Sequence, residues 1–378
     1  MERAAGQQLT LFPERVVLTV NTGSSSIKCS LARVTNGDVV PLTRVQREAT
    51  EQNRSKVLDA ILSDLARADL PTPESAGHRV VHGGVRYQSP VLIDATVLDE
   101  LRALMPLAPL HQPAALDGIA AVSRHYPHLA QVACFDTAFH HDLPEVAKRL
   151  PLPDELWEAG VRRYGFHGLS YEHIVATVGP GELGHAVLAH LGSGASLAAV
   201  HHGRSVDTTM AFTPASGILM STRAGDLDPS ILVYLAREQG YTPDALEQLI
   251  EGESGLLALS GSTADMRALL DARATDPRAA LAVATFCYRV RAQIGAYAAV
   301  LGGLDTLVFT GGIGERSGPI RAEICDGLEH LGVRIDAAAN DRNDHIIGKP
   351  KHGCTVRVVP TDEELVIARH TASFVSDA

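Results

Sequence analysis

The chain has 378 residues, more than one hydrophobic core usually supports, so two domains are expected. Apolar residues make up 45% of the chain and charged residues 20%, a composition typical of globular proteins. The formal net charge of −11 argues against a nucleic-acid partner, because proteins that bind the phosphate backbone present basic faces. The charge remains compatible with a nucleotide that is held by loops and a metal ion.

The five cysteines are scattered and form no CxxC pair. Such a number favours small core residues in a reducing compartment over disulfides or a zinc site. No apolar run reaches the roughly 18 residues of a membrane span. Residues 1–14 lack the apolar core of a signal peptide and are expected to form a loose extension. We therefore expect a cytoplasmic protein with no membrane partner.

The stretch at 16–31, VVLTVNTGSSSIKCSL, predicts two strands joined by a turn of small residues. The β-branched run at 16–20 indicates a buried strand, and the alternation from residue 26 onward indicates a half-buried one. Asn36-Gly37 is a strong hairpin signal and predicts a third strand after it. Small residues in the first turn would let backbone N–H groups approach an anion, but an ordinary serine-rich hairpin explains them equally well.

Residues 185–201 repeat this pattern, with Gly-Ser-Gly-Ala-Ser as the turn between two apolar runs. Gly203 and Val206 then follow as the hairpin and third strand do in the first half. Two halves that open alike indicate a duplicated domain with a cleft between the copies. Clefts between domains commonly hold ligands.

Between the hairpins, helical spacing and short apolar runs continue the first half as βββαβαβ. The predicted elements are helices at 54–67, 94–105 and 113–126 and strands at 77–84 and 131–135. The proline-rich segment 140–158 is expected to connect the halves.

The second half contains a long stretch without periodicity at 208–228, and loops of that length are usually functional or mobile. A helix is predicted at 277–301, and a buried strand at 304–310 runs into Gly311-Gly312-Ile313-Gly314. The last predicted elements are a strand at 354–359, a capping box from Thr361 to Glu364 and a final helix at 365–374.

Six polar residues stand in glycine- or proline-bounded loops near predicted strand ends. They are Arg79, His111, Asp136, His167, Arg223 and Glu363. Each has a structural explanation, such as a paired core arginine, a buried imidazole or a carboxylate at a helix dipole. Together they fit one chemistry, because arginine binds phosphate and carboxylate oxygens in bidentate geometry and carboxylates suit Mg²⁺.

The glycine loop at 311–314 lies between a strand and a helix, where a nucleotide can bind. A tight turn explains the same residues. The loop is not a GxGxxG motif, and the chain contains no GxxxxGK[ST] and no protein-kinase signature set.

The chain resembles the acetate and propionate kinase family, a group within the actin-like and sugar kinase superfamily, over residues 17–371. The resemblance rests on ten motifs in the family's order: NTGSSSIK, GHRVVHGG, LAPLHQP, FDTAFH, RRYGFHG, AHLGSGAS, MAFTPASG, STRAGDLDP, FTGGIGE and PTDEELVIAR. It implies an α/β fold of duplicated actin-like (ribonuclease H-like) βββαβαβα domains flanking a central cleft. The implied domains are 1–138 with 362–378, and 139–361.

The resemblance implies reversible, direct in-line phosphoryl transfer between ATP and acetate, which gives ADP and acetyl phosphate for acetyl-CoA biosynthesis. The implied cofactor is Mg²⁺, which Mn²⁺ can replace, and the implied assembly is a homodimer formed largely through the second domain. A carboxylate acceptor is already ionised at neutral pH and needs no general base. Asp136 is therefore better interpreted as a metal-site group than as a base.

The resemblance also implies roles for individual residues. The implied catalytic residues are Arg79, His111, Asp136, His167 and Arg223. The implied metal-site residues are Asn21 and Glu363. The implied acyl pocket consists of Val81, Leu110, Phe166 and Pro214. The implied nucleotide-binding residues are Lys28, His190, Leu191, Gly192, Ser193, Gly194, Asp265, Met266, Arg267, Gly311, Gly312, Ile313 and Gly314.

Three residues, Ser193, Arg316 and Asp362, depart from the family pattern, each standing where Asn is usual. The first two bear on the nucleotide or phosphoryl donor, and Asp362 adds a negative charge beside the metal site. Three alternatives stay open: propionate as the preferred substrate, an actin-like ATPase without a carboxylate pocket, and a nucleotide-binding regulator without kinase activity. One methylene is worth only about 1–3 kcal/mol of discrimination, so the sequence leaves the acyl preference undecided.

Overall fold

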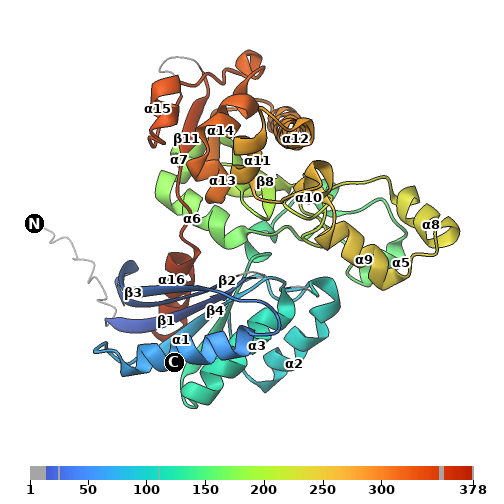
Figure 1. The fold of residues 1–378 in the computed structure, drawn as a ribbon. Coiled ribbons are helices and arrows are strands. Elements are labelled where there is room, and N and C mark those ends of the chain that lie inside the picture. Colours follow the sequence, from blue (N-terminus) through green and yellow to red (C-terminus); the bar gives the residue numbers. More distant parts are fainter. Residues whose placement is uncertain (1–13, 24–25, 110, 349–352, 377–378) are drawn as a thin grey trace, which may run out of the picture. The chain divides into compact units, whose positions relative to one another are not determined.

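The chain divides into two compact units in the computed structural model (Figure 1). Unit 1 comprises Met1–Phe135 with Glu363–Ala378, and unit 2 comprises Asp136–Asp362. The structure describes residues 14–23, 26–109, 111–348 and 353–376. Leu110, predicted for the acyl pocket, lies outside the described residues.

Unit 1 is built on a sheet with the strand order β3-β2-β1-β4-β6-β5. The strands are β1 (Arg15–Thr22), β2 (Ser26–Thr35), β3 (Asp38–Glu48), β4 (Ser75–Val80), β5 (Val91–Leu92) and β6 (Ala130–Phe135). The predicted antiparallel meander of β1, β2 and β3 is confirmed, and β4 and β6 run parallel to β1. Asn36 (φ 52°) and Gly37 (φ 85°) form the hairpin with positive φ at both central residues, as a type I′ turn requires.

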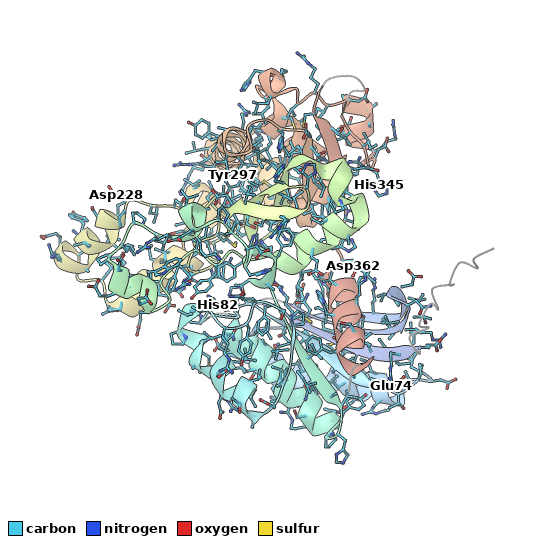
Figure 2. All side chains as sticks on the ribbon, turned by 180° about the vertical axis from the view of Figure 1, so that it is seen from behind. Glu74, His82, Asp228, Tyr297, His345 and Asp362 are labelled. Carbon is cyan, nitrogen blue, oxygen red and sulfur yellow. The ribbon has the colours of Figure 1, made fainter. Side chains whose placement is uncertain are left out.

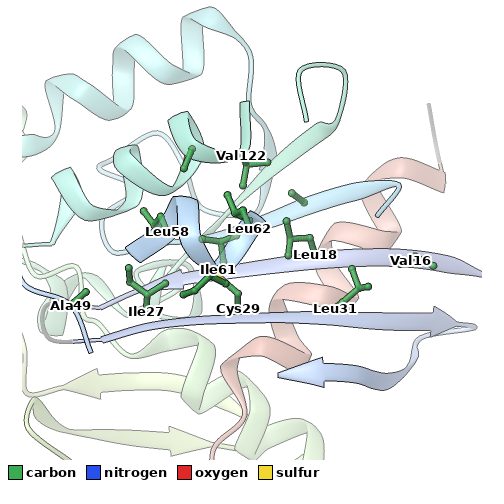
Figure 3. Packing of buried hydrophobic residues seen from close by; sticks show 13 residues of the cluster. Val16, Leu18, Ile27, Cys29, Leu31, Ala49, Leu58, Ile61, Leu62 and Val122 are labelled. Carbon is green, nitrogen blue, oxygen red and sulfur yellow. The ribbon is translucent and has the colours of Figure 1, made fainter. Parts of the chain in front are cut away.

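Helices cover both faces of this sheet. The helices of unit 1 are α1 (Arg54–Arg67), α2 (Ala95–Ala103), α3 (Gln112–His125) and α16 (Glu363–Ser376), with a short 3₁₀ turn at Met105–Leu107. Leu18 of β1 belongs to a buried cluster with Leu62 of α1 and Val122 of α3 (Figure 3). Its neighbour Val17 points to the other face, where it clusters with Ala368 of α16. The C-terminal helix therefore returns to the first unit.

Unit 2 repeats the topology of unit 1. Its strands are β7 (His185–Leu191), β8 (Ala195–His201), β9 (Arg204–Thr208), β10 (Thr306–Thr310) and β11 (Thr355–Val358). Their order β9-β8-β7-β10-β11 matches β3-β2-β1-β4-β6, with the same antiparallel and parallel pairings. His202 (φ 47°) and Gly203 (φ 81°) even repeat the positive-φ hairpin. The duplication predicted from the sequence echo is thus confirmed.

Helices make up much of the rest of unit 2. They are α4 (Glu145–Lys148), α5 (Asp154–Glu158), α6 (Gly168–Val178), α7 (Pro180–Leu183), α8 (Pro229–Glu238), α9 (Pro243–Gly252), α10 (Gly255–Ser260), α11 (Met266–Ala272), α12 (Pro277–Leu301), α13 (Gly311–Arg316), α14 (Gly318–Cys325) and α15 (Ala337–Asp341), with 3₁₀ turns at Ala138–His140 and Glu329–Leu331. Tyr171 and Ile174 of α6 are buried against β7 and β8, and α12 contacts the same strands.

Capping residues explain the ends of several helices. The Asp276 carboxylate accepts a hydrogen bond from the Arg278 amide at the start of α12, and Gly302 (φ 74°) ends that helix. Asp228, labelled in Figure 2, accepts from the Ser230 amide at 2.9 Å and starts α8. The predicted bounds of α12 are correct for this reason.

Three local predictions need correction. The strand predicted at 77–84 ends at Val80, and the chain turns at Gly84 (φ 62°). The connecting segment 140–158 contains the short helices α4 and α5. The Thr361 amide donates to Glu315 and its hydroxyl donates to Ser170, so these groups are engaged outside the predicted capping box.

The five cysteines are buried and free, as predicted for small core residues. Burial raises the pKa of the Cys29, Cys287 and Cys354 thiols to about 12, so these thiols stay protonated. In the described part of the chain, no helix is long and apolar enough to cross a membrane.

His78 of β4 is a buried imidazole in the centre of unit 1. The Gln131 side-chain amide donates to Ser123 at 2.8 Å, so its oxygen accepts from His78 Nε2 at 2.7 Å. Burial lowers the pKa of His78 to about 4. The folded chain therefore holds His78 neutral under conditions in which the unfolded chain protonates it.

We expect His78 to make unit 1 sensitive to acid. An unfolded histidine has a pKa of about 6.5, so between about pH 6.5 and 4 only the unfolded state binds this proton. The free energy of unfolding should fall as the pH drops through that window, by at most about 3 kcal/mol from this residue. His78→Gln should flatten this slope in urea titrations, whereas His128→Gln, at an exposed position, controls for the loss of an imidazole. Equal slopes for wild type and His78→Gln would contradict the assignment.

Candidate functional site

Unit 1 brings four charged or polar side chains together at the end of β1. The Asn21 amide donates to Glu363 at 2.8 Å and to Glu364 at 3.2 Å. Arg79 donates to the Asn21 side-chain oxygen at 3.3 Å and lies 3.6 Å from the Glu363 carboxylate. Asn21, Glu363 and Glu364 are buried. The first turn of α16 thus supplies two carboxylates to a cluster that β1 and β4 begin.

Three other predicted residues of unit 1 lie on or next to its strands and helices in the sequence. Val81 is buried and directly follows β4. Lys28 of β2 pairs with Asn21 in the β1–β2 register. His111 immediately precedes α3. The side-chain roles predicted for these three residues remain predictions.

In unit 2, two predicted catalytic side chains meet at the β7–β8 turn. A Cβ atom placed on Gly194 would lie 3.3 Å from His167 Nε2 and 3.4 Å from Arg223 Nη1. A side chain at position 194 would therefore crowd both groups. His167 also stacks on His190 of β7, with ring centroids 4.2 Å apart. The turn, two imidazoles and one guanidinium form a compact group of polar atoms.

Arg223 lies in the long loop predicted at 208–228, and backbone hydrogen bonds hold that loop in place. The Ser221 amide donates to the Ser193 carbonyl at 3.1 Å, which ties the loop to the β7–β8 turn. The Ala224 amide donates to Ile250 of α9 at 2.9 Å. The Arg223 side chain donates to the Pro214 carbonyl at 3.2 Å. The loop is therefore a fixed support for Arg223.

Glu251 of α9 is a buried carboxyl close to Arg223. Burial raises the pKa of Glu251, and the charge of Arg223 acts against that increase. Glu251 also accepts the Thr222 hydroxyl through its backbone carbonyl at 2.8 Å. The C-terminal end of α9 thus holds the backbone of the Arg223 loop and places a carboxyl group near Arg223.

The glycine loop predicted at 311–314 is instead the first turn of helix α13, which begins directly after β10 and packs against the end of β7. Gly311 has φ 75°, and a Cβ atom there would lie 2.7 Å from the Leu191 carbonyl oxygen. Only glycine fits such an approach without strain. Glu315 accepts from the Gly311 amide at 3.0 Å. The buried Arg321 donates to the Gly314 carbonyl at 2.8 Å, so both ends of the loop are held.

A pocket of about 810 Å³ opens beside these two turns. It is lined by Gly192, Ser193, Ser221, Thr222, Ala264, Asp265, Met266, Arg267, Leu270, Gly312, Ile313, Arg316, Ser317 and Pro319. Its size is that of a small-molecule site, and main-chain atoms of two glycine turns form part of its wall.

Seven predicted nucleotide residues lie in this lining: Gly192, Ser193, Asp265, Met266, Arg267, Gly312 and Ile313. The other predicted residues of unit 2 are not in the lining: His190 and Leu191 belong to β7, Gly194 to the β7–β8 turn, and Gly311 and Gly314 to α13. Sequence reasoning missed six lining residues: Ser221, Thr222, Ala264, Leu270, Ser317 and Pro319. The length of the 208–228 loop was the one available signal for Ser221 and Thr222.

Three further predicted residues also belong to unit 2. Asp136 follows β6 directly and is buried, and its backbone carbonyl accepts from the Gly168 amide at 2.9 Å. Phe166 is buried and directly precedes His167 in the sequence. Pro214 is also buried, and its carbonyl accepts a hydrogen bond from the Arg223 side chain. The predicted acyl-pocket residues are thus divided between the units, and that pocket remains a prediction.

The residues around Asn21 fit a hard divalent cation. Among the described residues, no group of three or more His, Cys, Asp or Glu side chains is arranged to hold a metal ion. Mg²⁺ does not require such a group, because it keeps several waters and usually takes one or two carboxylates. Glu363 and Glu364 are adjacent buried carboxylates that both accept from the Asn21 amide nitrogen, and two carboxylates are a set of ligands of that kind.

Comparisons with known proteins identify the family of this chain. The model of the Acetokinase family matches residues 16–369. An acetate kinase of Pseudarthrobacter chlorophenolicus is 45% identical, with 95% of this chain and 98% of the relative covered. An acetate kinase of Rhizobium meliloti is 43% identical, with 95% and 98% covered.

Solved structures agree as well. Porphyromonas gingivalis acetate kinase has a TM-score of 0.82 at 35% identity, over 96% of this chain and 100% of that chain. A Francisella tularensis propionate kinase has a TM-score of 0.84 at 33% identity, over 95% and 99%. Motifs, duplicated fold and relatives all lead to one conclusion: this chain belongs to the Acetokinase family.

Proposed function

We propose that the chain transfers the γ-phosphoryl group of ATP to acetate, reversibly, giving acetyl phosphate and ADP. The family assignment makes the chain a phosphotransferase with a carboxyl group as acceptor. The observation that carries the proposal is the meeting of His167 Nε2 and Arg223 Nη1 at Gly194, beside a pocket of nucleotide size. Donors placed in this way can bind the equatorial oxygens of a transferring phosphoryl group.

The nucleotide would occupy the pocket of unit 2. Gly192 and Gly312 have no side chains there, so a phosphate chain can come close to the main chain. Arg267 and Arg316 add positive charge to the lining, which favours a polyphosphate. Arg316, one of the departures from the family pattern, therefore works in favour of nucleotide binding.

Arg79 would bind the acceptor carboxylate from unit 1. Its guanidinium is already surrounded by Asn21 and Glu363, which hold it at the end of β4. Acetate is ionised at neutral pH, so the reaction needs positioning and positive charge but no general base. Asp136 would therefore act at the metal site.

Mg²⁺ would be held through Glu363 with the Asn21 side chain beside it, and Mn²⁺ could replace it. When bound, the metal neutralises charge that develops on the phosphoryl oxygens. The contribution of the chain is to keep Glu363 and Glu364 buried and fixed by the Asn21 amide. The departure Asp362 adds one more negative charge directly before them in sequence.

A hydroxamate assay with ATP and Mg²⁺ tests the activity. We expect trapped acyl phosphate with acetate, and a lower kcat/KM with propionate, by a factor that one methylene in an apolar pocket can supply, about 10- to 200-fold. A higher kcat/KM with propionate would favour the alternative substrate. ATP turnover that ignores both acids would indicate an ATPase of the same fold. Absence of Mg-ADP binding in calorimetry would indicate a regulator without activity.

The same assay tests the arginines. Arg79→Ala and Arg223→Ala should each lower kcat/KM about 100-fold or more, because each removes a positive charge from the transition state. Arg124→Ala and Arg204→Ala are matched controls in units 1 and 2, since both side chains are largely exposed and form surface ion pairs. Near-normal turnover of the two site variants would refute the proposed roles.

Gly312→Val tests the nucleotide pocket. No atom lies within 4 Å of a Cβ placed on Gly312, so the variant should fold normally while its side chain projects into the pocket. We expect Mg-ADP affinity in calorimetry to fall at least tenfold, because a valine displaces ligand atoms there. Gly181→Val makes the same change where the structure is also open, but outside the pocket lining. Equal affinities for the two variants would place the nucleotide elsewhere.

We also propose a homodimer formed through unit 2, in a reducing compartment such as the cytoplasm. Five free cysteines support the compartment. In α8, no residue is buried, although Ile231, Val233 and Tyr234 are apolar. The outer face of α12 exposes Leu281 and Tyr288 in the same way. Exposed apolar helix faces of this kind are typical of surfaces that a second copy covers.

Light scattering tests the dimer. The wild type should have twice the mass of one chain, and the double variant Ile231→Glu with Tyr234→Glu should shift it toward the monomer by placing charges in an apolar interface. Val40→Glu changes an exposed valine of unit 1 and should leave the dimer intact. A monomeric wild type, or dissociation by Val40→Glu alone, would contradict an interface in unit 2.

A further inference from the structure

We propose that Ser196 and Tyr171 are positioning residues that hold His167 in the tautomer with its proton on Nε2. This inference deepens the proposed function, since it rests on His167 binding the transferring phosphoryl group. Nε2 is the ring nitrogen that faces the turn at Gly194, beside Arg223. A phosphoryl oxygen only accepts hydrogen bonds, so His167 is useful there only if Nε2 carries the proton.

The three side chains form one chain of hydrogen bonds. Nδ1 of His167 lies 2.8 Å from the Ser196 hydroxyl oxygen. The Ser196 oxygen lies 2.5 Å from the Tyr171 hydroxyl oxygen. Ser196 and Tyr171 are both fully buried, so water does not compete for these groups. The chain therefore runs from the interior of unit 2 to the imidazole at the turn.

Burial fixes the direction of donation. A phenol O–H is a stronger hydrogen-bond donor than an aliphatic O–H, so Tyr171 is the donor in its bond to Ser196. The Tyr171 proton needs an acceptor, and Ser196 Oγ is the one that the described residues provide. The Ser196 proton is then directed to His167 Nδ1, which must be unprotonated to accept it. The remaining proton of the neutral ring is on Nε2.

Local structure places these groups close together. His167 adopts a left-handed backbone (φ 59°, ψ 23°) immediately before α6, an uncommon conformation for a residue other than glycine. Tyr171 lies one helical turn later, and its amide donates to the His167 carbonyl at 3.1 Å. Ser196 comes from β8, where it pairs with His190 of β7. Helix start and hairpin together thus assemble the relay.

A second relay beside the first supports this interpretation. Thr361 donates to Ser170 at 2.8 Å, and the Ser170 oxygen lies 2.8 Å from His190 Nδ1. A Cβ placed on Gly192 would lie 3.8 Å from His190 Nε2, so that ring also turns Nε2 to the glycine turn. Two stacked imidazoles, 18° from parallel, thus have the same polarity. The adjacent residues Ser170 and Tyr171 set both.

The variants Ser196→Ala and Tyr171→Phe test the relay, since each removes only one oxygen atom. Nitrogen-15 NMR of labelled histidine should show the Nε2–H form of His167 in the wild type and a mixture with the Nδ1–H form in both variants. We expect kcat to fall about tenfold while KM for ATP stays within about twofold, because loss of an orienting partner typically costs 10- to 100-fold. His167→Ala identifies the His167 signals.

A double-mutant cycle separates this inference from the function on which it rests. Ser196→Ala should have no further effect on kcat in the His167→Ala background, because it acts through that ring. Ser205→Ala is the matched control, since it removes a buried serine hydroxyl 2.8 Å from Nδ1 of His140 and should leave kcat within about twofold. Rescue by Ser196→Thr, which keeps the hydroxyl, would support the relay.

The outcomes are distinguishable. If His167→Ala leaves kcat unchanged, the proposed role of His167 is wrong. If His167→Ala lowers kcat but Ser196→Ala and Tyr171→Phe keep both the tautomer and kcat, the relay is wrong and the role of His167 stands. If Ser205→Ala loses as much kcat as Ser196→Ala, the loss reflects a general destabilisation of the fold. This result would also overturn the relay.

Discussion

The close approach of two backbone segments determines the site in unit 2. β7 and β10 are parallel neighbours, and Gly311, the first residue of α13 after β10, lies against the carbonyl of Leu191 at the end of β7. A Cβ atom at 2.7 Å from that oxygen cannot be accommodated, so the contact exists only because residue 311 is glycine with a positive φ. The pocket wall, with Gly192 on one turn and Gly312 on the other, follows from this contact.

The two copies of the fold use equivalent strand ends differently. In unit 2 glycines follow the ends of β7 and β10, and Gly192 and Gly312 are part of the pocket lining. In unit 1 the equivalent strands β1 and β4 carry Asn21 and Arg79, whose charges and amide are balanced by carboxylates of α16. The two copies thus share one backbone arrangement and differ in the side chains at the equivalent strand ends.

The sequence correctly predicted the strands and helices whose positions depend on local periodicity and capping. The hairpins follow from alternating strands and from Asn36-Gly37, and α12 follows from Asp276 and Gly302 at its ends. Contacts between distant segments were not predictable in this way. Thr361 has the local pattern of a capping residue, but Glu315 and Ser170 engage its amide and hydroxyl. Similarly, no periodicity places Ser221 at the pocket, because the loop that carries it is held by single backbone bonds.

The same reasoning explains why the departures from the family pattern are compatible with the site. Ser193 contributes its carbonyl to the Ser221 amide, a bond that any residue in that position can make. Arg316 lines the pocket, where a cation favours an anionic ligand. Asp362, labelled in Figure 2, directly precedes Glu363 and Glu364, which accept hydrogen bonds from Asn21 in unit 1. Substitutions are tolerated where the backbone defines the geometry. The groups whose proton positions must be fixed, such as His167, are instead tied into buried hydrogen-bond chains.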